Sequence, residues 1–147
     1  MLDSKDRKIL RELRHDASLH VTQLAKKLKL PRSTVQNRIE RMKKQGIIKR
    51  FVALPDYDRV GLPVTAFILL TYTPTEEISQ QDAAKAIAKL ENVYEVHVVA
   101  GQWDIILKAR GSSLQEIGEL VVNRLRQIPG VGQTVTSGCF FTIKEEP

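Results

Sequence analysis

The spacing of the apolar residues changes near Gly46, and this change most limits what the chain can fold into. Before Gly46, apolar side chains recur at intervals of three and four residues, which is the repeat of one α-helix face. After it, β-branched and aromatic residues gather in short runs separated by Gly, Pro and Asp, which is typical of strands and turns. The sequence therefore predicts an α+β protein whose first third is helical and whose remainder combines strands with helices.

The first third predicts three short helices. Asp3 can cap the first, which should run to about His15. The second should begin near Val21 and span about two turns, and the third should end near Gly46, which can adopt a left-handed conformation. The inner faces should carry Ile9, Leu10, Leu13, Leu24, Ala25, Leu28, Val35, Ile39 and Met42. Two short helices joined by a tight turn predict a three-helix, winged-helix-like helix-turn-helix domain over residues 1–50.

Residues 51–63 are predicted to be a linker strand followed by an irregular connection. Ile47–Leu54 is a β-prone run that Pro55 interrupts, and Asp56–Pro63 is rich in residues that favour turns. The domain boundary is therefore expected inside this stretch, which leaves 64–147 as a second domain.

The second domain is predicted to have the element order βαββαβ. Strands are expected at Val64–Tyr72, Tyr94–Ala100, Asp104–Arg110 and Thr134–Ile143, and helices at about Gln80–Leu90 and Leu114–Ile128. This order is typical of a ferredoxin-like domain, in which both helices cover one face of an antiparallel sheet. The other face would then be open, and apolar residues there predict self-association; the candidates are Phe67, Leu69, Val99 and Phe141.

The charges of the chain are unevenly distributed. Residues 1–50 hold 15 Lys and Arg against 5 Asp and Glu, a net charge of +10, whereas residues 51–147 hold 8 against 12, a net charge of −4. A compact basic module joined to a mildly acidic one is expected when only the first module binds a polyanion. A solvated lysine-rich surface is the alternative that charge alone leaves open.

At this point the sequence resembles the Lrp/AsnC family of transcriptional regulators over nearly its whole length. Val21–Leu28 followed by Arg32–Ile39 is similar to the family's helix-turn-helix, and Gly46-Ile47-Ile48 to the exit from its recognition helix. Gly101-Gln102-Trp103-Asp104 matches the Gly-x-x-Asp hairpin of the family's effector-binding domain. The segment Ile128–Val131 with Thr134 and Thr136 matches the passage into its last strand.

Two residues depart from the family pattern, which usually has Gly where Lys29 stands and a capping Ser or Thr where Pro31 stands. Lysine in a left-handed turn costs about 1 kcal/mol relative to glycine, which a packed helical unit tolerates. Pro31 leaves two starts open for the third helix. Either Leu30 is the cap, or Ser33 is the cap with Gln36 as its capping-box partner.

One face of the third helix is the predicted DNA-reading surface. At 100° per residue, Ser33, Asn37 and Arg41 fall opposite the buried side chains, and Arg32 and Gln36 flank them. Arg, Asn, Gln and Ser are residue types that bind base edges, whereas lysines such as Lys43 are better suited to phosphates. The predicted DNA-binding residues are Arg32, Ser33, Thr34, Gln36, Asn37, Arg41, Lys43 and Lys44. A solvated polar helix face is the alternative.

The hairpin Gly101–Asp104 is the predicted effector site. Gly101 can adopt a positive φ and expose backbone N–H groups to a carboxylate, and Asp104 can accept a hydrogen bond from an ammonium group, so the pair suits a free amino acid. The alternative is a turn that Asp104 caps. Thr134 and Thr136 join the site on the grounds of the resemblance alone.

No pattern of a catalytic or metal site occurs, so we expect neither enzyme activity, nor a cofactor, nor a bound metal. His15, His20 and His97 are scattered, and no nucleophile elbow, phosphate loop or dinucleotide motif is present. Cys139 is the single cysteine and is expected to be an inert packing residue, which fits a reducing compartment. No apolar run reaches the roughly 18 residues of a membrane span, and the N-terminus has no signal-peptide pattern, so the cytoplasm is the expected location.

Together these patterns predict a sequence-specific DNA-binding regulator that responds to a small effector. The resemblance implies that double-stranded DNA and an amino acid are its partners, and that the second domains form homodimers and larger rings such as octamers. Two other functions stay open: an architectural protein that wraps DNA without an effector, and an accessory module that binds small molecules.

Overall fold

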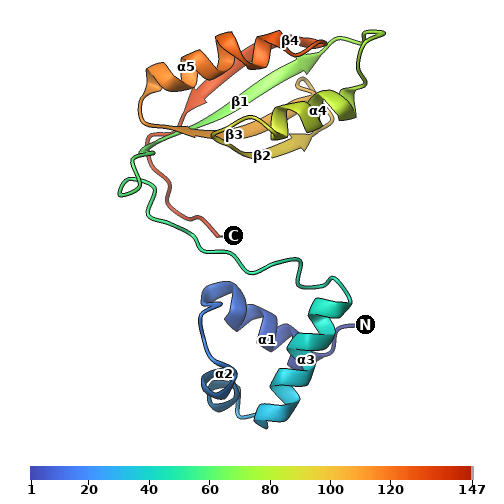
Figure 1. The fold of residues 1–147 in the computed structure, drawn as a ribbon, viewed down its shortest axis with the longest axis vertical. Coiled ribbons are helices and arrows are strands. Elements are labelled where there is room, and N and C mark those ends of the chain that lie inside the picture. Colours follow the sequence, from blue (N-terminus) through green and yellow to red (C-terminus); the bar gives the residue numbers. More distant parts are fainter. Residues whose placement is uncertain (147) are drawn as a thin grey trace. The chain divides into compact units, whose positions relative to one another are not determined.

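The computed structural model describes residues 1–146 and divides the chain into two compact units. One unit contains Met1–Leu54 together with the C-terminal residues from Lys144, and the other contains Pro55–Ile143. Figure 1 shows a helical first unit, and a second unit that combines a sheet with helices. None of the helices in the described residues is long and apolar enough to cross a membrane.

The first unit is the predicted three-helix arrangement. It consists of α1 (Ser4–His15), α2 (Val21–Leu28) and α3 (Arg32–Lys44). Asp3 caps α1 in a capping box with Asp6, as its sequence position predicts. Lys29 ends α2 with a φ of 53°, so this lysine does adopt the left-handed conformation. The helices enclose a core of Ile9, Leu24, Ala25, Val35, Ile39 and Met42.

The start of α3 differs from both predicted starts. Pro31 itself is the N-cap, with a φ of −58° and a ψ of 139°, and the helix begins at Arg32. Proline has no side-chain acceptor, so no side chain caps this end, but the Pro31 carbonyl accepts the first helical hydrogen bond from the Val35 N–H at 3.1 Å. Ser33 and Gln36 therefore lie inside the helix with exposed side chains, and neither is used as a cap.

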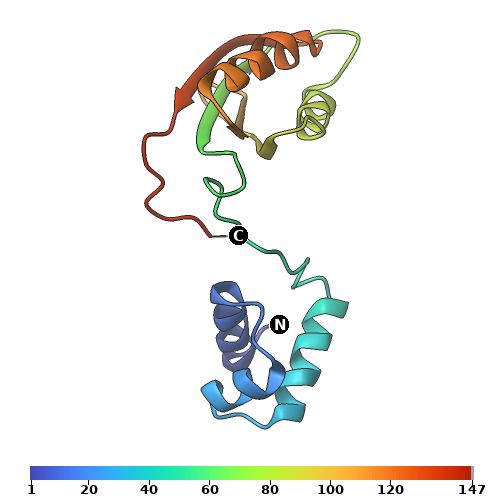
Figure 2. The same cartoon turned by 60° about the vertical axis from the view of Figure 1, so that its left-hand side comes forward.

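The second unit is the predicted ferredoxin-like domain. Its strands are β1 (Val64–Tyr72), β2 (Val93–Val98), β3 (Ile105–Gly111) and β4 (Val131–Gly138), and they form an antiparallel sheet in the order β2-β3-β1-β4. Its helices are α4 (Gln80–Ala88), α5 (Leu114–Asn123) and the short 3₁₀ helix η1 (Leu125–Gln127). Figures 1 and 2 show α4 and α5 on the same face of the sheet.

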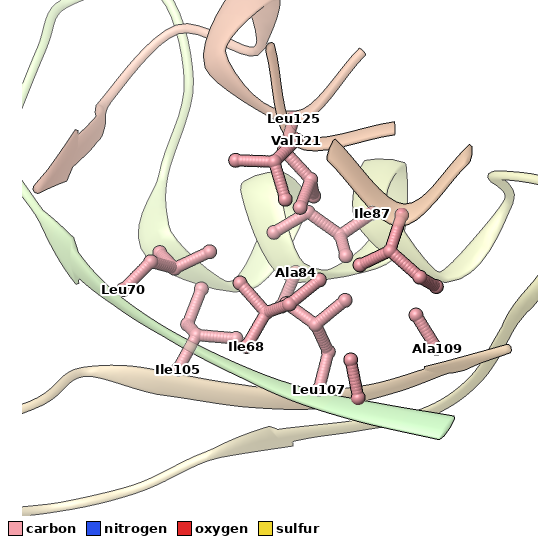
Figure 3. Close-up of a cluster of buried hydrophobic side chains, with 11 residues drawn as sticks. Ile68, Leu70, Ala84, Ile87, Ile105, Leu107, Ala109, Val121 and Leu125 are labelled. Carbon is pink, nitrogen blue, oxygen red and sulfur yellow. The ribbon is translucent and has the colours of Figure 1, made fainter. Parts of the chain in front are cut away.

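Alternate residues of the central strands form the core beneath these helices. Ile68 and Leu70 of β1 and Ile105 and Leu107 of β3 are fully or almost fully buried, and Figure 3 shows them directed at helix residues such as Ile87. The two-residue repeat of strands places Phe67, Leu69 and Ile106 on the opposite, open face.

The predicted elements that differ most from the structure are the linker strand, the last strand and the last helix. The linker strand expected within 51–63 is not formed, because no strand among residues 1–146 pairs with its β-prone residues. The last strand ends at Gly138, beside the first residues of its antiparallel partner β1. The final bond runs from the Cys139 N–H to the Thr65 carbonyl at 2.8 Å. The helix expected over Leu114–Ile128 stops at Asn123, because Arg124 leaves the helical region with a φ of −124°.

Candidate DNA interface and effector site

A buried carboxylate fixes α3 against α1. Asp6 has no exposed surface, and its two oxygens accept hydrogen bonds from Arg38 at 2.8 Å and from Arg41 at 2.6 Å. Arg38 also bonds the Asp3 carboxylate at 2.6 Å. Because these charge-assisted bonds join residues more than 30 positions apart, they set the orientation of α3 within the unit.

The carboxylates of this network remain ionised well into acid. Burial acts to raise the pKa of Asp6, but the Asp3 backbone N–H, the Arg38 guanidinium and the charge of Arg41 outweigh burial and hold that pKa below its ordinary value. The Asp6 backbone N–H and then Arg38 lower the pKa of Asp3 to about 2. A second link of this kind joins α1 to α2, where the Lys27 ammonium lies 2.5 Å from the Glu12 carboxylate and lowers the pKa of Glu12.

The outer face of α3 carries most of the residues that the sequence predicts to bind DNA. Thr34 is half-buried, and the other seven are exposed: Arg32, Ser33, Gln36, Asn37, Arg41, Lys43 and Lys44. Within residues 1–146, the side chains of Arg32, Ser33, Asn37 and Lys44 make no hydrogen bond or ion pair to another described residue. They are available to an outside partner.

Three of the predicted side chains are engaged within the unit. Arg41 binds Asp6 with a side chain that is 45% exposed, so only part of its guanidinium faces outward. Gln36 and Lys43 contact Glu40, at 3.5 Å and 3.2 Å respectively. The two contacts with Glu40 join exposed side chains, so they are weak and are easily exchanged for contacts with a phosphate.

The predicted effector residues lie toward one end of the sheet. Leu70 of β1 is opposite Thr134 on one side and Ile105 on the other, and Asp104 directly precedes Ile105. Thr136 pairs with Ile68, two residues further along the strand. Gly101 has a φ of 142°, as a turn with a positive φ requires, and its backbone is exposed.

Two of these residues already have partners in the chain. The Asp104 carboxylate accepts a 2.7 Å hydrogen bond from the Tyr72 backbone N–H, while the Asp104 N–H donates to the Leu70 carbonyl at 3.0 Å. Arg126 donates to the Thr134 hydroxyl at 3.0 Å. One carboxylate oxygen of Asp104 therefore bonds the end of β1, and not the Gly101 turn that the alternative interpretation assigned to it.

A cavity of about 280 Å³ lies at the other end of the sheet. Arg110, which is opposite Thr65 near the start of β1, lines it together with residues of α5 such as Glu116. None of the predicted effector residues lines this cavity. Among the described residues, no group of three or more His, Cys, Asp or Glu is placed to hold a metal ion.

Sequence reasoning missed several residues that shape these sites. Arg38 was assigned no role, although its three-residue spacing from Arg41 places both on the side of α3 that meets Asp6. Arg126 was missed because its contact with Thr134 depends on how η1 packs against β4. The acidic pair Asp3 and Asp6 in a strongly basic segment was the one available signal for the network.

Comparisons with known proteins agree with both halves of this description. Residues 2–49 match the winged helix-turn-helix DNA-binding family, and residues 65–147 match the Lrp/AsnC ligand binding domain. The chain is 48% identical over 146 residues to an HTH-type transcriptional regulator of Pyrococcus horikoshii, covering 99% of this chain and 97% of that one. It is 30% identical over 144 residues to the proline dehydrogenase transcriptional activator of Rhizobium radiobacter, covering 98% and 92%.

A solved structure extends the likeness to three dimensions. The crystal structure of a transcriptional regulator from Neisseria meningitidis in complex with L-Met has a TM-score of 0.91 and 25% identity, covering 99% of this chain and 94% of that one. Two matched domains in this order join a DNA-binding module to a ligand-binding module, and the relatives are regulators of transcription and not enzymes. The chain therefore belongs to the Lrp/AsnC family of transcriptional regulators.

Proposed function

We propose that this regulator reads specific DNA sequences with the outer face of α3 and changes its assembly or DNA affinity when it binds an amino acid. The observation that supports DNA reading is the set of uncommitted side chains Arg32, Ser33 and Asn37 within residues 1–50, whose net charge is +10. In this proposal residues 1–50 are the DNA-binding domain, 51–63 the connection and 64–147 the assembly and sensing domain. The cytoplasm is the proposed compartment, since the bacterial and archaeal relatives are transcriptional regulators.

The side chains on α3 divide into two kinds of contact. Arg32 has paired donors that recognise the guanine edge, Asn37 has a donor and an acceptor that recognise the adenine edge, and Ser33 can bond several acceptors. Lys43, Lys44 and the exposed part of Arg41 supply positive charge for phosphates, which positions the helix without reading sequence. Thr34 and Gln36 complete the surface at its margins.

The variants Arg32→Ala and Asn37→Ala should each weaken binding to the preferred duplex by about 1 to 3 kcal/mol, because each loses a base contact. Binding to random duplex should change much less. Lys43→Ala is the matched control, since it removes a phosphate contact and should weaken both duplexes equally. Fluorescence anisotropy with both duplexes measures these ratios. Equal losses on both duplexes for all three variants would support the architectural alternative.

The open face of the sheet supports a homodimer. Phe67 is 40% exposed and Val135 39% exposed, and the strand register places Leu69 between Ile106 and Val135 on this same face. Val99 and Phe141, which the sequence also assigned here, lie outside the strands. A contiguous apolar patch on a sheet needs cover, and a second copy of the same face provides it with two-fold symmetry. Larger rings such as octamers would be built from these dimers.

The proposed effector is a free amino acid bound at Gly101–Asp104, with Thr134 and Thr136 nearby. Two findings support it: residues 65–147 match a ligand-binding domain, and the similar Neisseria regulator is a complex with L-Met. The remaining oxygen of Asp104 can accept the ammonium group, while backbone N–H groups at Gly101 can bind the carboxylate. An effector acts only if it binds two assemblies with different affinity.

Asp104→Asn should reduce amino-acid affinity by about 10- to 100-fold, because a hydrogen bond to a charged group contributes about 1.5 to 3 kcal/mol. The asparagine oxygen can still accept the Tyr72 N–H, so the fold should survive. Calorimetry against a panel that includes methionine measures the loss, and Thr75→Ala, a loop variant outside the proposed site, is the control. If wild type binds no amino acid at millimolar concentration, Asp104 serves only to bond the Tyr72 N–H, and the proposal of an amino-acid effector fails.

A further inference from the structure

The connection between the two units is ordered at one end. Within Asp56–Leu62, the Leu62 N–H bonds the Tyr57 carbonyl at 2.8 Å and the Val60 N–H bonds the Asp56 carbonyl at 3.2 Å, so this stretch forms a compact turn. Arg59 also pairs with Asp56 at 3.2 Å. Tyr57, at the start of the turn, is half-buried, whereas its neighbours are exposed.

Tyr57 is held by a buried arginine of the sheet. The Arg110 guanidinium carbon lies 3.5 Å from the centre of the Tyr57 ring, and the Tyr94 ring meets Tyr57 edge-on with 5.5 Å between centres. Arg110 is only 4% exposed, and it donates a 2.8 Å hydrogen bond to the Thr65 hydroxyl. Cation–π contacts are stronger where water is excluded, so this arrangement anchors the turn to the sheet.

The stretch before the turn has no comparable support. Ile48 still bonds back to the Met42 carbonyl at the end of α3 and packs on the helical core. Residues 49–55 are all exposed, and none of their backbone N–H groups donates a hydrogen bond to another described residue. Seven residues therefore lie between Ile48, which still bonds to the end of α3, and Asp56, where the turn begins.

We infer that the Tyr57–Arg110 anchor sets the length of the tether between the DNA-reading unit and the sheet, and thereby the spacing of DNA half-sites that a dimer accepts. Seven extended residues span at most about 25 Å, whereas loss of the anchor would free residues 49–63 and about double that reach. A longer tether tolerates more spacings with less preference among them. Tyr57 and Arg110 are positioning residues in this inference, which rests on the proposed dimeric reading of DNA.

The test compares full-length wild type with Tyr57→Ala and Tyr57→Phe on duplexes selected by wild type from random sequence. Their two half-sites are then moved apart in single base pairs from about one helical turn to about two. Each of the three chains is also tested with Glu146→Ala, which removes the exposed Arg14–Glu146 ion pair between the C-terminal tail and α1.

Wild type should prefer one spacing by about tenfold or more, and Tyr57→Ala should flatten this profile while its affinity for a single half-site stays unchanged. Tyr57→Phe keeps the ring over Arg110 and should restore the wild-type profile. A Tyr57→Ala profile as sharp as that of wild type would overturn the inference. The affinity for the single half-site is the control, because a general loss of folding would lower that affinity as well.

Trypsin gives a readout that does not depend on DNA. Wild type should be cut at Lys49 and Arg50 before Arg59, because Arg59 lies inside the anchored turn, and Tyr57→Ala should lose this difference. If no duplex binds wild type, the proposed function fails and the digestion pattern still decides whether the anchor exists. Equal cutting at Arg59 in wild type and Tyr57→Ala would overturn the anchor itself.

Discussion

Replacing Asp6 by alanine should destabilise the helix-turn-helix unit by about 3 kcal/mol. Asp6 is fully buried, and its removal leaves Arg38 and Arg41 without their shared partner. Breaking a buried ion pair typically costs about 3 to 5 kcal/mol, and the lower end applies here because both arginines reach solvent. The variant also loses the capping box of α1.

Hydrogen exchange of α1 and α3 amides is the measurement, because Trp103 is the only tryptophan and reports on the other unit. Trp103 fluorescence should therefore show unchanged unfolding of the sheet domain. Asp16→Ala is the matched control, since the Asp16 side chain is exposed and, within residues 1–146, accepts hydrogen bonds only from Ser18. Similar exchange rates in Asp6→Ala and wild type would show that the network does not hold the helices together.

Lowering the pH should reduce the stability that the Asp6 network contributes. The folded pKa of Asp6 lies below its ordinary value, so the stability it contributes is present above about pH 4, the unfolded value, and is lost as the pH falls through the folded value. Asp3, with a folded pKa of about 2, extends this loss toward pH 2. Exchange measured between pH 5 and pH 2 should show a shallower loss in Asp6→Asn than in wild type.

Phe67→Asp should convert the proposed dimer into a monomer. Phe67 lies on the open face of β1, and a carboxylate buried in a two-fold interface would occur twice for each dimer. Sedimentation at micromolar concentration should give half the wild-type mass. Val122→Asp is the matched control because Val122 is 52% exposed on α5, on the helix-covered side of the sheet. A Phe67→Asp protein that remains dimeric would place the interface elsewhere.

Local pattern predicted most of the fold because helices and strands repeat their buried positions at different intervals. Val35, Ile39 and Met42 are buried as the helical spacing predicts, and β1 occupies Val64–Tyr72 as expected. Element ends were less predictable since they depend on partners. The last strand stops beside the first residues of β1, where its pairing partner begins. The linker residues form no strand, because no other strand among the described residues lies beside them.

The candidate sites were proposed from residue type and spacing, which do not predict side-chain pairing. Helical geometry placed Asn37 and Arg41 on one face, yet Arg41 also binds Asp6, a contact that requires knowing how α1 packs. The bond between Asp104 and the Tyr72 N–H depends in the same way on where β1 ends. The contact of Tyr57 with Arg110 joins residues 53 positions apart, so the spacing of neighbouring residues does not predict it.

The most direct test of the central claim is the affinity of the full-length protein for a selected duplex and for a random one across a salt series. A sequence-specific reader should bind the selected duplex about 1,000-fold or more tightly, and both affinities should fall with salt at a logarithmic slope of about −0.9 for each phosphate contacted. A protein that binds both duplexes equally at every salt concentration, or binds neither, would contradict the account.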